Sequence, residues 1–170
     1  MNVQHSSQTD RWFTPLSILA LVKEVLGEIE LDPASEFIAN QFVGAQRFIS
    51  EGSLTQEWKA ETVFLNPPGS RVGNQSQSAL FWRKLVREFE GGNVQEAIFL
   101  GFSIELLAVS QNYDCKSVLD YTICVPKKRI RFVDPLFPMK SSPSHSNVIV
   151  YLGSNVEKFK SVFRDLGACK

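Results

Sequence analysis

The tripeptide Asn66-Pro67-Pro68 carries the groups in this sequence that are best suited to chemistry. An amine attached to an aromatic ring is a weak nucleophile, because its lone pair is delocalised into the ring. The Asn66 side-chain oxygen and the Pro67 carbonyl could each accept one hydrogen of such an amine, and two prolines would hold these acceptors in place before a substrate binds. The same tripeptide is also an ordinary way to end a strand in a turn. It therefore indicates either a site for an aromatic amine or a simple strand end.

The tripeptide follows one of two strand-like runs that are broken by proline. Thr62-Val63-Phe64-Leu65 is a compact apolar run, and an earlier run at residues 29–31 ends in the loop Asp32-Pro33-Ala34-Ser35. Proline cannot donate to a strand ladder, so each run should end at its loop. In open α/β sheets, ligands bind outside the carboxyl ends of the strands. We therefore expect both loops to lie at a ligand-binding edge.

Hydrophobic spacing predicts the other elements that must position these loops. Helices are expected after Thr14-Pro15 as far as Gly27, over residues 79–89, from Ser103 to about Ser110, and after the capping box Ser154-Asn155-Val156-Glu157. Further strands are expected over residues 47–49, 97–102, 118–125, 129–133 and 147–152. Helices and strands alternate early and strands cluster late, which predicts an α/β fold with a mostly parallel sheet and an antiparallel edge.

Length, charge and cysteine content limit the number of domains and the classes of protein that the sequence could represent. The 170 residues contain 18 basic and 18 acidic side chains, so no overall positive field would draw the chain onto nucleic acid. We expect a flexible arm at residues 1–10 and one domain over residues 11–170, with residues 69–78 as a long functional loop. The three cysteines lack the spacing of a zinc site or a disulfide framework. No long apolar run occurs, so we expect a cytoplasmic protein that does not span a membrane and binds no metal.

Several motifs together resemble one enzyme family over most of the chain, from Trp12 to Leu152. They are Thr14-Pro15 with its helix, Leu31-Asp32-Pro33-Ala34-Ser35, the segment from Leu54 to Trp58, Val63-Phe64-Leu65-Asn66-Pro67-Pro68, the helix with Phe81-Trp82, and Arg129-Ile130-Arg131-Phe132. In their order and spacing they resemble the phage-type, Dam-like DNA N6-adenine methyltransferases. The resemblance implies a Rossmann-like methyltransferase fold with S-adenosylmethionine as the methyl donor.

The resemblance also implies the roles of the two loops. Asn66, Pro67 and Pro68 would form the catalytic motif, and the amino-acid end of the cofactor would lie between Thr14-Pro15 and the loop Asp32, Pro33, Ala34 and Ser35. This assignment is physically reasonable, since the Asp32 carboxylate could accept from the cofactor's ammonium group. The alternative for Asp32 is an N-cap of the next helix.

Gly69 departs from the family, which usually has Tyr or Phe directly after the two prolines. That ring is expected to stack on the extruded base, a contact worth roughly 1–3 kcal/mol. Either another aromatic residue such as Phe81, Trp82 or Phe132 takes over this contact, or base selectivity and rate suffer. The helical spacing of Phe81 and Trp82 favours a place in the core over a base-binding role.

Contacts with DNA would have to be local. Arg71, in the polar loop after Gly69, could contact phosphate, and so could the basic cluster Lys127, Lys128, Arg129 and Arg131. A solvated loop and a solvated sheet edge are the alternatives for these two segments.

The sequence thus predicts an enzyme that methylates the N6 amino group of adenine in double-stranded DNA. The residues expected to contact the substrate are Gly69, Arg71, Phe81, Trp82, Lys127, Lys128, Arg129, Arg131 and Phe132. One alternative is a catalytically weakened methyltransferase-like protein that binds DNA or a host protein, which Gly69 suggests. Another is a methyltransferase for a different amine, such as RNA adenine, cytosine N4 or a protein glutamine.

Overall fold

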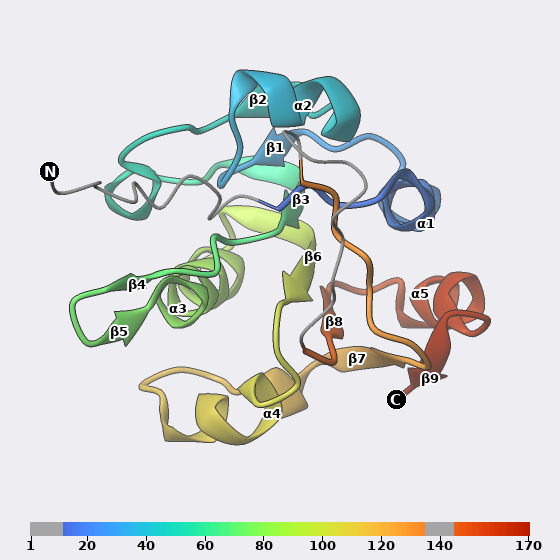
Figure 1. The fold of residues 1–170 in the computed structure, drawn as a ribbon. Helices are drawn as coiled ribbons and strands as arrows, with labels where there is room; N and C mark the ends of the chain where they lie inside the picture. The colour runs from blue at the N-terminus through green and yellow to red at the C-terminus, as the bar shows by residue number, and fades with distance from the viewer. Residues whose placement is uncertain (1–11, 135–144) are drawn as a thin grey trace, which may run out of the picture.

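A seven-stranded mixed sheet organises the chain in the computed structural model, which describes residues 12–134 and 145–170 (Figure 1). The strand order is β2-β1-β3-β6-β8-β7-β9. The strands are β1 (Leu31–Asp32), β2 (Arg47–Phe48), β3 (Ala60–Leu65), β6 (Val94–Gly101), β7 (Thr122–Pro126), β8 (Val148–Leu152) and β9 (Gly167–Cys169). Two further strands, β4 (Arg71–Val72) and β5 (Gln75–Ser76), form a separate hairpin.

Four of the seven strands are parallel to one another, and the other three form an antiparallel edge. Strands β2, β1, β3 and β6 pair in parallel, whereas β8 pairs antiparallel with both β6 and β7, and β9 pairs antiparallel with β7. The expected α/β class, with a mostly parallel sheet and an antiparallel edge, is therefore confirmed.

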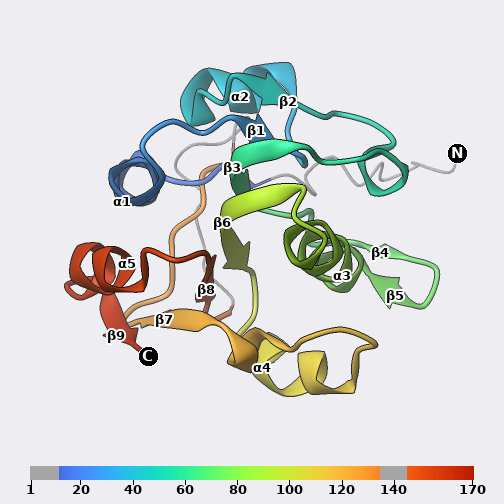
Figure 2. The same cartoon turned by 180° about the vertical axis from the view of Figure 1, so that it is seen from behind.

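Helices cover both faces of the sheet (Figures 1 and 2). They are α1 (Leu16–Leu26), α2 (Phe37–Val43), α3 (Gln77–Glu90), α4 (Leu106–Val109) and α5 (Val156–Phe163). Successive residues of a strand point to opposite faces, and β3 divides its side chains accordingly. Phe64 packs into the cluster with α1 and α5, while Val63 and Leu65 pack into the cluster with α3. This burial on both faces explains why the central strands are continuous apolar runs.

Some local expectations are wrong, each for a physical reason. The helix α1 begins at Leu16 with Pro15 as its N-cap, because the Thr14 hydroxyl accepts a hydrogen bond from Asn66 instead of capping the helix. The expected capping box before α5 does not form: the Asn155 N–H donates to the Tyr151 hydroxyl at 2.9 Å. Residues 118–120 form a 3-10 turn closed by Ser117 and Asp120, and so β7 begins only at Thr122.

The expected strand at residues 129–133 is also absent. The Ile130 N–H donates to the Asn147 side chain, and Val133 forms an isolated antiparallel bridge with Phe13. Conversely, β9 and the β4–β5 hairpin were not expected. The short strands of the hairpin lie in a stretch whose polar composition is typical of a loop.

Asn147 lies at the start of β8 and joins three segments of backbone. Its side chain, 2% exposed, accepts from Ile130 N at 2.9 Å and donates to Phe102 O at 2.9 Å and to Gly101 O at 3.5 Å. These bonds hold the residue that follows β6 beside the segment that follows β7.

Replacing Asn147 should destabilise the fold. Asn147→Ala leaves buried backbone groups without partners, so we expect the free energy of unfolding to fall by roughly 2–4 kcal/mol. Urea denaturation would measure the change, with exposed Gln95→Ala as the control, expected within about 0.5 kcal/mol of the natural chain. Equal stabilities of the two variants would contradict the role given to Asn147.

Candidate functional site: a pocket at the carboxyl ends of β1 and β3

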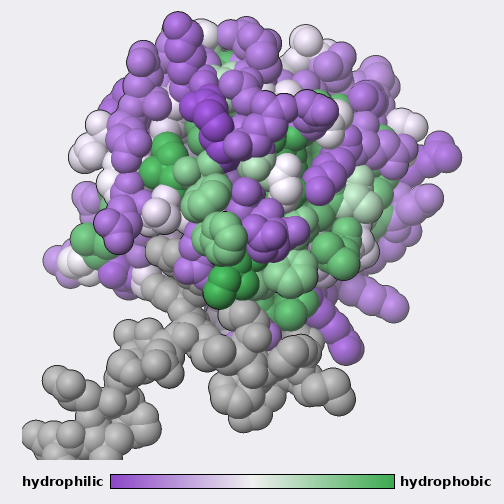
Figure 3. All heavy atoms as spheres, turned by 90° about the horizontal axis from the view of Figure 1, so that it is seen from above, coloured by the Kyte–Doolittle hydropathy of each residue, from purple (hydrophilic) through white to green (hydrophobic). Residues whose placement is uncertain are grey.

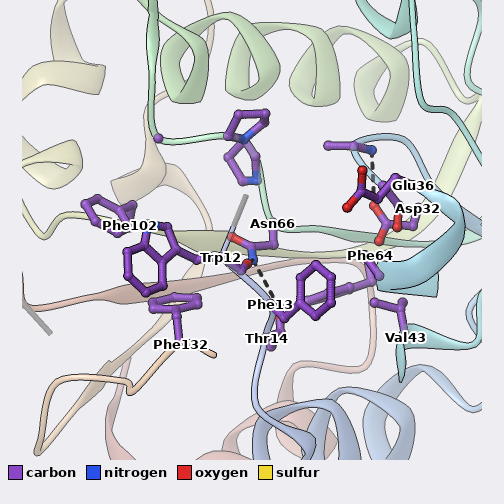
Figure 4. Close-up of a pocket in the computed structure, with 16 residues that line it drawn as sticks. Trp12, Phe13, Thr14, Asp32, Glu36, Val43, Phe64, Asn66, Phe102 and Phe132 are labelled. Carbon is purple, nitrogen blue, oxygen red and sulfur yellow. Dashed lines mark hydrogen bonds between the residues drawn. The ribbon is translucent and has the colours of Figure 1, made fainter. Parts of the chain in front are cut away.

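A pocket opens where β1 and β3 end side by side (Figure 4). The two strands are parallel neighbours, with Leu31 opposite Val63, so the loops that follow them meet at the same edge of the sheet. The pocket encloses about 600 Å³, counting the part open to solvent. Its lining consists of Trp12, Phe13, Thr14, Asp32, Ala34, Ser35, Glu36, Ala39, Val43, Phe64, Asn66, Pro67, Pro68, Gly69, Phe102 and Phe132.

Asn66 is held in one orientation by the segment that precedes α1. Its Nδ2 donates to the Trp12 carbonyl at 3.0 Å and to the Thr14 hydroxyl at 3.1 Å. Both amide hydrogens are thereby used, and the side-chain oxygen is left as the acceptor. No described residue donates a hydrogen bond to this oxygen or to the Pro67 carbonyl. The pocket thus offers two acceptors that are fixed before a ligand binds.

The acidic end of the pocket contains Asp32 and Glu36, which Figure 4 shows together on one side of Asn66. The Asp32 carboxylate, 3% exposed, accepts from Ala34 N at 3.1 Å, which closes a local turn rather than capping α2. Burial raises the pKa of Asp32 from 3.8 to about 7, although the hydrogen bond from the Ala34 amide favours the ionised form. This end of the pocket is therefore suited to a cationic group that would stabilise the carboxylate.

Ser35 contributes an unpaired polar atom at the same end. Ser35 is 4% exposed, and its hydroxyl makes no hydrogen bond with any described residue. Burying a hydroxyl without a partner costs free energy, and such groups are usually completed by water or a ligand. The described lining also contains no Lys, Arg or His. A ligand with an ammonium group and an oxygen acceptor would satisfy both features.

The aromatic end lies on the other side of Asn66, where Figure 4 shows Trp12, Phe102 and Phe132 grouped together. Phe102 follows β6, and its ring centroid is 6.1 Å from that of Phe132. The Asn147 hydrogen bonds described above fix the backbone at Phe102 and at Ile130, two residues before Phe132. Flat aromatic surfaces beside two fixed acceptors suit a planar ring that carries an amine.

A second cavity adjoins the pocket and shares Ala34, Ser35 and Pro68 with it. It encloses about 590 Å³, counting open space, and lies between the loop after β1 and residues 49–55. Its lining includes Glu51 and Ser53, and the buried Ser53 hydroxyl also lacks a partner among the described residues. The two cavities together could hold an elongated ligand that passes across Ser35 and Pro68.

The helix α2 covers the acidic end of the pocket. Glu36, Ala39 and Val43 line the pocket, whereas Phe37 and Ile38 point outward and are 70% and 59% exposed. Figure 3 looks down on this side of the molecule and shows hydrophobic side chains among the hydrophilic ones. The inner side of α2 therefore lines the pocket, and its outer side exposes Phe37, Ile38 and Phe42.

Most of the expected site residues come together here. Thr14, Asp32, Ala34, Ser35, Asn66, Pro67, Pro68, Gly69 and Phe132 line the pocket, and Pro33 lines the second cavity. Pro15 lines neither cavity and serves as the N-cap of α1. Arg71 lies on the β4–β5 hairpin, outside both linings.

Phe81 and Trp82 were expected to contact the substrate, but they belong to the core under α3. Trp82 is fully buried, its indole N–H donates to Lys116 O at 3.1 Å, and its ring packs edge-on against Phe99. Phe81 is 5% exposed and stacks on Trp58, although its edge reaches the second cavity. Neither ring lines the pocket beside Asn66.

The basic cluster Lys127, Lys128, Arg129 and Arg131 lies on the segment after β7 and is exposed. Ile130 and Phe132, which alternate with these residues, are buried, and Phe132 reaches the pocket. The cluster itself lines neither cavity, so its charges lie on the outer surface of the segment that supplies part of the aromatic end.

Trp12, Glu36 and Phe102 were not expected in the site. Phe102 is the last residue of the strand expected at residues 97–102 and directly follows β6. It could have been found if β6 had been recognised as the parallel neighbour of β3. Trp12 enters through the hydrogen bond between its carbonyl and Asn66, across 54 positions, for which the sequence gives no signal. Glu36 is one charged residue among several near the loop, and only its position at the start of α2 distinguishes it.

Within residues 12–134 and 145–170, no three His, Cys, Asp or Glu side chains are grouped so that they could hold a metal ion. In the same part of the chain, no helix has the length and apolar character needed to cross a membrane.

The buried Asp32 should make stability depend on pH. Because its folded pKa, about 7, lies above its ordinary value of 3.8, the neutral carboxyl stabilises the fold fully below about pH 4, and this contribution is lost as pH rises to 7. Asp32→Asn stays neutral at every pH. Relative to this variant, the natural chain should therefore lose stability between pH 4 and 7, by on the order of 4 kcal/mol, and the difference should stay constant above pH 7. Urea unfolding at several pH values, with the exposed Asp165→Asn as a control, would measure it. A difference that does not change with pH would contradict the burial of an ionisable Asp32.

Comparison of the chain with known proteins gives no further assignment: no family model, no curated protein and no solved structure matches it.

Proposed function

We propose that this protein transfers a methyl group from S-adenosylmethionine to the N6 amino group of adenine in DNA, on a Rossmann-like methyltransferase fold. The observation that supports this most is the orientation of Asn66. Its Nδ2 is bound to Trp12 and Thr14, and its oxygen remains available beside the Pro67 carbonyl. Two acceptors in a fixed arrangement match the two hydrogens of an exocyclic amine.

The residues of the acidic end fit the amino-acid portion of the methyl donor. Asp32 and Glu36 offer carboxylates to its ammonium group, and the unpaired Ser35 hydroxyl can donate to its carboxylate. The adjoining cavity would take the nucleoside portion, with Glu51 accepting from the ribose hydroxyls. When bound, the donor supplies a sulfonium methyl group as the electrophile.

The protein contributes orientation and electrostatics to the transfer. Asn66 and Pro67 accept the two amine hydrogens, which localises the nitrogen lone pair and directs it at the methyl carbon. A carbon–nitrogen bond forms as the carbon–sulfur bond breaks, and the electron pair of that bond stays on sulfur. The amine then loses one proton to water. No histidine or other side-chain base is required.

The aromatic end would hold the target base. Gly69 has no ring to offer, but Trp12, Phe102 and Phe132 lie on the side of Asn66 away from Asp32 and Glu36. Stacking on one of these rings would compensate for extruding the base from the duplex. The basic cluster on the segment that carries Phe132 would contact phosphates near the extruded base.

Loss of the Asn66 acceptor should reduce the chemical step. We expect Asn66→Ala to lower kcat about 100- to 1,000-fold, which is typical when one preorganised polar group is removed from a transition state. Binding of S-adenosylmethionine should change little, because Asn66 lies outside the acidic end. Transfer from labelled S-adenosylmethionine to unmethylated duplex DNA, followed by mass analysis of the nucleosides, gives the readout.

Asn112→Ala is the matched control, since Asn112 is an exposed residue of the 3-10 helix Ser110–Asn112, and this variant should retain full activity. Unfolding temperatures with and without cofactor verify that Asn66→Ala is folded. If the natural protein yields no N6-methyladenine, or Asn66→Ala yields as much as the natural protein, the proposal is wrong.

Gly69 gives a second and opposite test. A Cβ built at Gly69 meets no other atom within 4 Å, and the backbone there does not have a positive φ, so a larger side chain can be accommodated. Gly69→Tyr would add a ring to the base site, and we expect the KM for DNA to fall about tenfold with the cofactor affinity unchanged. Steady-state kinetics on duplex DNA measures both, with Asn112→Tyr as the control for an added surface ring. A higher KM for DNA in Gly69→Tyr would contradict the position proposed for the base.

A further inference from the structure

Two of the three cysteines face each other on neighbouring strands. Cys124 lies in β7 and Cys169 in β9, and the antiparallel register places them directly opposite one another. Residues that are directly opposite in an antiparallel pair direct their side chains to the same face of the sheet. Both side chains accordingly pack in the cluster with α1 and α5, Cys124 fully buried and Cys169 partly buried. Two free thiols are therefore neighbours in the fold, although they are far apart in the sequence.

The hydrogen-bond pattern shows which kind of opposite pair these cysteines form. Ile123 and Lys170 exchange both backbone hydrogen bonds, at 2.8 and 2.9 Å. Bonded pairs alternate with non-bonded pairs along an antiparallel ladder, so the adjoining pair, Cys124 and Cys169, is a non-bonded one. The Cα atoms of such a pair are about 4.5 Å apart, which lies within the range of about 4.4–6.8 Å that a disulfide bond requires.

Gly167 brings β9 close to β7 beside this pair. A Cβ built at Gly167 would collide with the backbone of Val125, so a residue with a side chain would push the two strands apart. Pro126, the partner of Gly167, lies at the next non-bonded position, where its missing N–H costs no hydrogen bond. Both residues thus support the register that places Cys124 opposite Cys169.

The two thiols differ in their surroundings. Burial, together with the neighbouring Cys169 thiol, raises the pKa of the Cys124 thiol, so Cys124 stays protonated at neutral pH. Its Sγ donates to the Phe163 carbonyl at 3.8 Å. Cys169 is only partly buried and lies on an edge strand of the sheet. An oxidant in solution therefore reaches Cys169 first, and Cys124 lies beside it as the thiol that can resolve the product.

The third cysteine lies on the opposite face of the sheet. Cys115 packs against the cluster with α3, whereas Cys124 and Cys169 belong to the cluster with α1 and α5. A bond from Cys115 to either of the other two would require the sheet to open. The folded chain therefore favours one pairing.

We propose that Cys124 and Cys169 form a disulfide bond when the protein meets hydrogen peroxide, and that this bond fastens β9 to β7. The Cys169 sulfur attacks one peroxide oxygen, a sulfur–oxygen bond forms as the oxygen–oxygen bond breaks, and the released hydroxide takes the thiol proton as water. The Cys124 sulfur then attacks the resulting sulfenic acid. The sulfur–sulfur bond forms, the sulfur–oxygen bond breaks, and the second hydroxide leaves as water with the Cys124 proton. The two thiols lose two electrons, which the peroxide gains.

The bond would hold the last strand of the sheet in place. The strand β9 has three residues and lies at the edge, beside β7 and α5 (Figure 1). A bond from Cys124 to Cys169 closes a covalent loop that contains β8 and α5, and it thereby restricts the unfolded chain. Exchange with a thiol opens the bond again, so the pair responds to the redox state of its surroundings. This inference does not rest on the proposed methyl transfer.

Mass analysis of the oxidised protein tests the pairing. The reduced natural chain, treated with hydrogen peroxide, should lose two of its three free thiols and the mass of two hydrogen atoms. Proteolysis without reductant should then yield the Cys124 peptide joined to the Cys169 peptide. Cys115→Ser is the matched control and should form the same bond, whereas Cys169→Ser should form no bond within the chain. The same treatment in urea should give mixed pairings, because the register is lost.

Stability provides a second readout. Oxidation should raise the unfolding temperature of the natural chain and of Cys115→Ser by about 5–15 °C, and dithiothreitol should reverse the rise. The unfolding temperature of Cys169→Ser should not change with peroxide, and its cooperative unfolding verifies that the variant is folded.

Three results would overturn the inference. They are the retention of all three thiols under conditions that form mixed disulfides in urea, a bond that includes Cys115, and a bond between two chains in place of one within the chain. A lower unfolding temperature after the Cys124 to Cys169 bond has formed would do the same, because the register would then not accommodate the bond.

Discussion

The double hydrogen bond from the Asn66 amide to Trp12 and Thr14 is the interaction on which the site depends. It joins the end of β3 to the segment before α1, and it settles which end of the amide donates and which accepts. An asparagine with a free amide could rotate and present either group to a ligand. Here the donors are used within the protein, so the oxygen is the group presented to the pocket. The parallel pairing of β1 with β3 then brings the acidic loop to the same edge.

The polarity of the pocket follows from the ends of three neighbouring strands. The loop after β1 supplies Asp32 and Ser35, the loop after β3 supplies Asn66, and the residue after β6 is Phe102. Acid, amide and aromatic surface are therefore arranged in the order of the strands across the sheet. A cation at one end and a planar amine at the other would meet beside Asn66, which is the arrangement that a transfer between two bound groups requires.

Sequence patterns predicted the sheet class and the two loops well, because both depend on local signals. Proline ends a strand wherever it falls, and apolar runs such as Thr62–Leu65 must be buried, so Asp32 and Asn66 could be located at strand ends. What could not be predicted depended on distant partners. Residues 129–133 have the composition of a strand, but Asn147 takes the Ile130 N–H, and Phe13 pairs with Val133. Phe81 and Trp82 have the helical spacing of core residues, and the structure places them in the core despite the resemblance that suggested a substrate role. Trp12 and Phe102 reach the site through contacts between distant segments, and the spacing of hydrophobic residues does not predict such contacts.

The place of β8 in the sheet has a consequence for how the chain acquires its structure. This strand lies between β6 and β7 and pairs with both, yet it follows both in the sequence, and all five of its residues are buried. Until Val148–Leu152 has been synthesised, β6 and β7 each present an unpaired edge, and the parallel strands and the antiparallel edge have no connection through the sheet. The sheet is therefore completed only when strands far apart in the sequence pair, and such contacts form slowly. Until then, the unpaired edges of β6 and β7 are sites where two chains can associate. Conditions that slow the insertion of this strand should reduce the yield of folded protein through aggregation, even when the finished fold is stable.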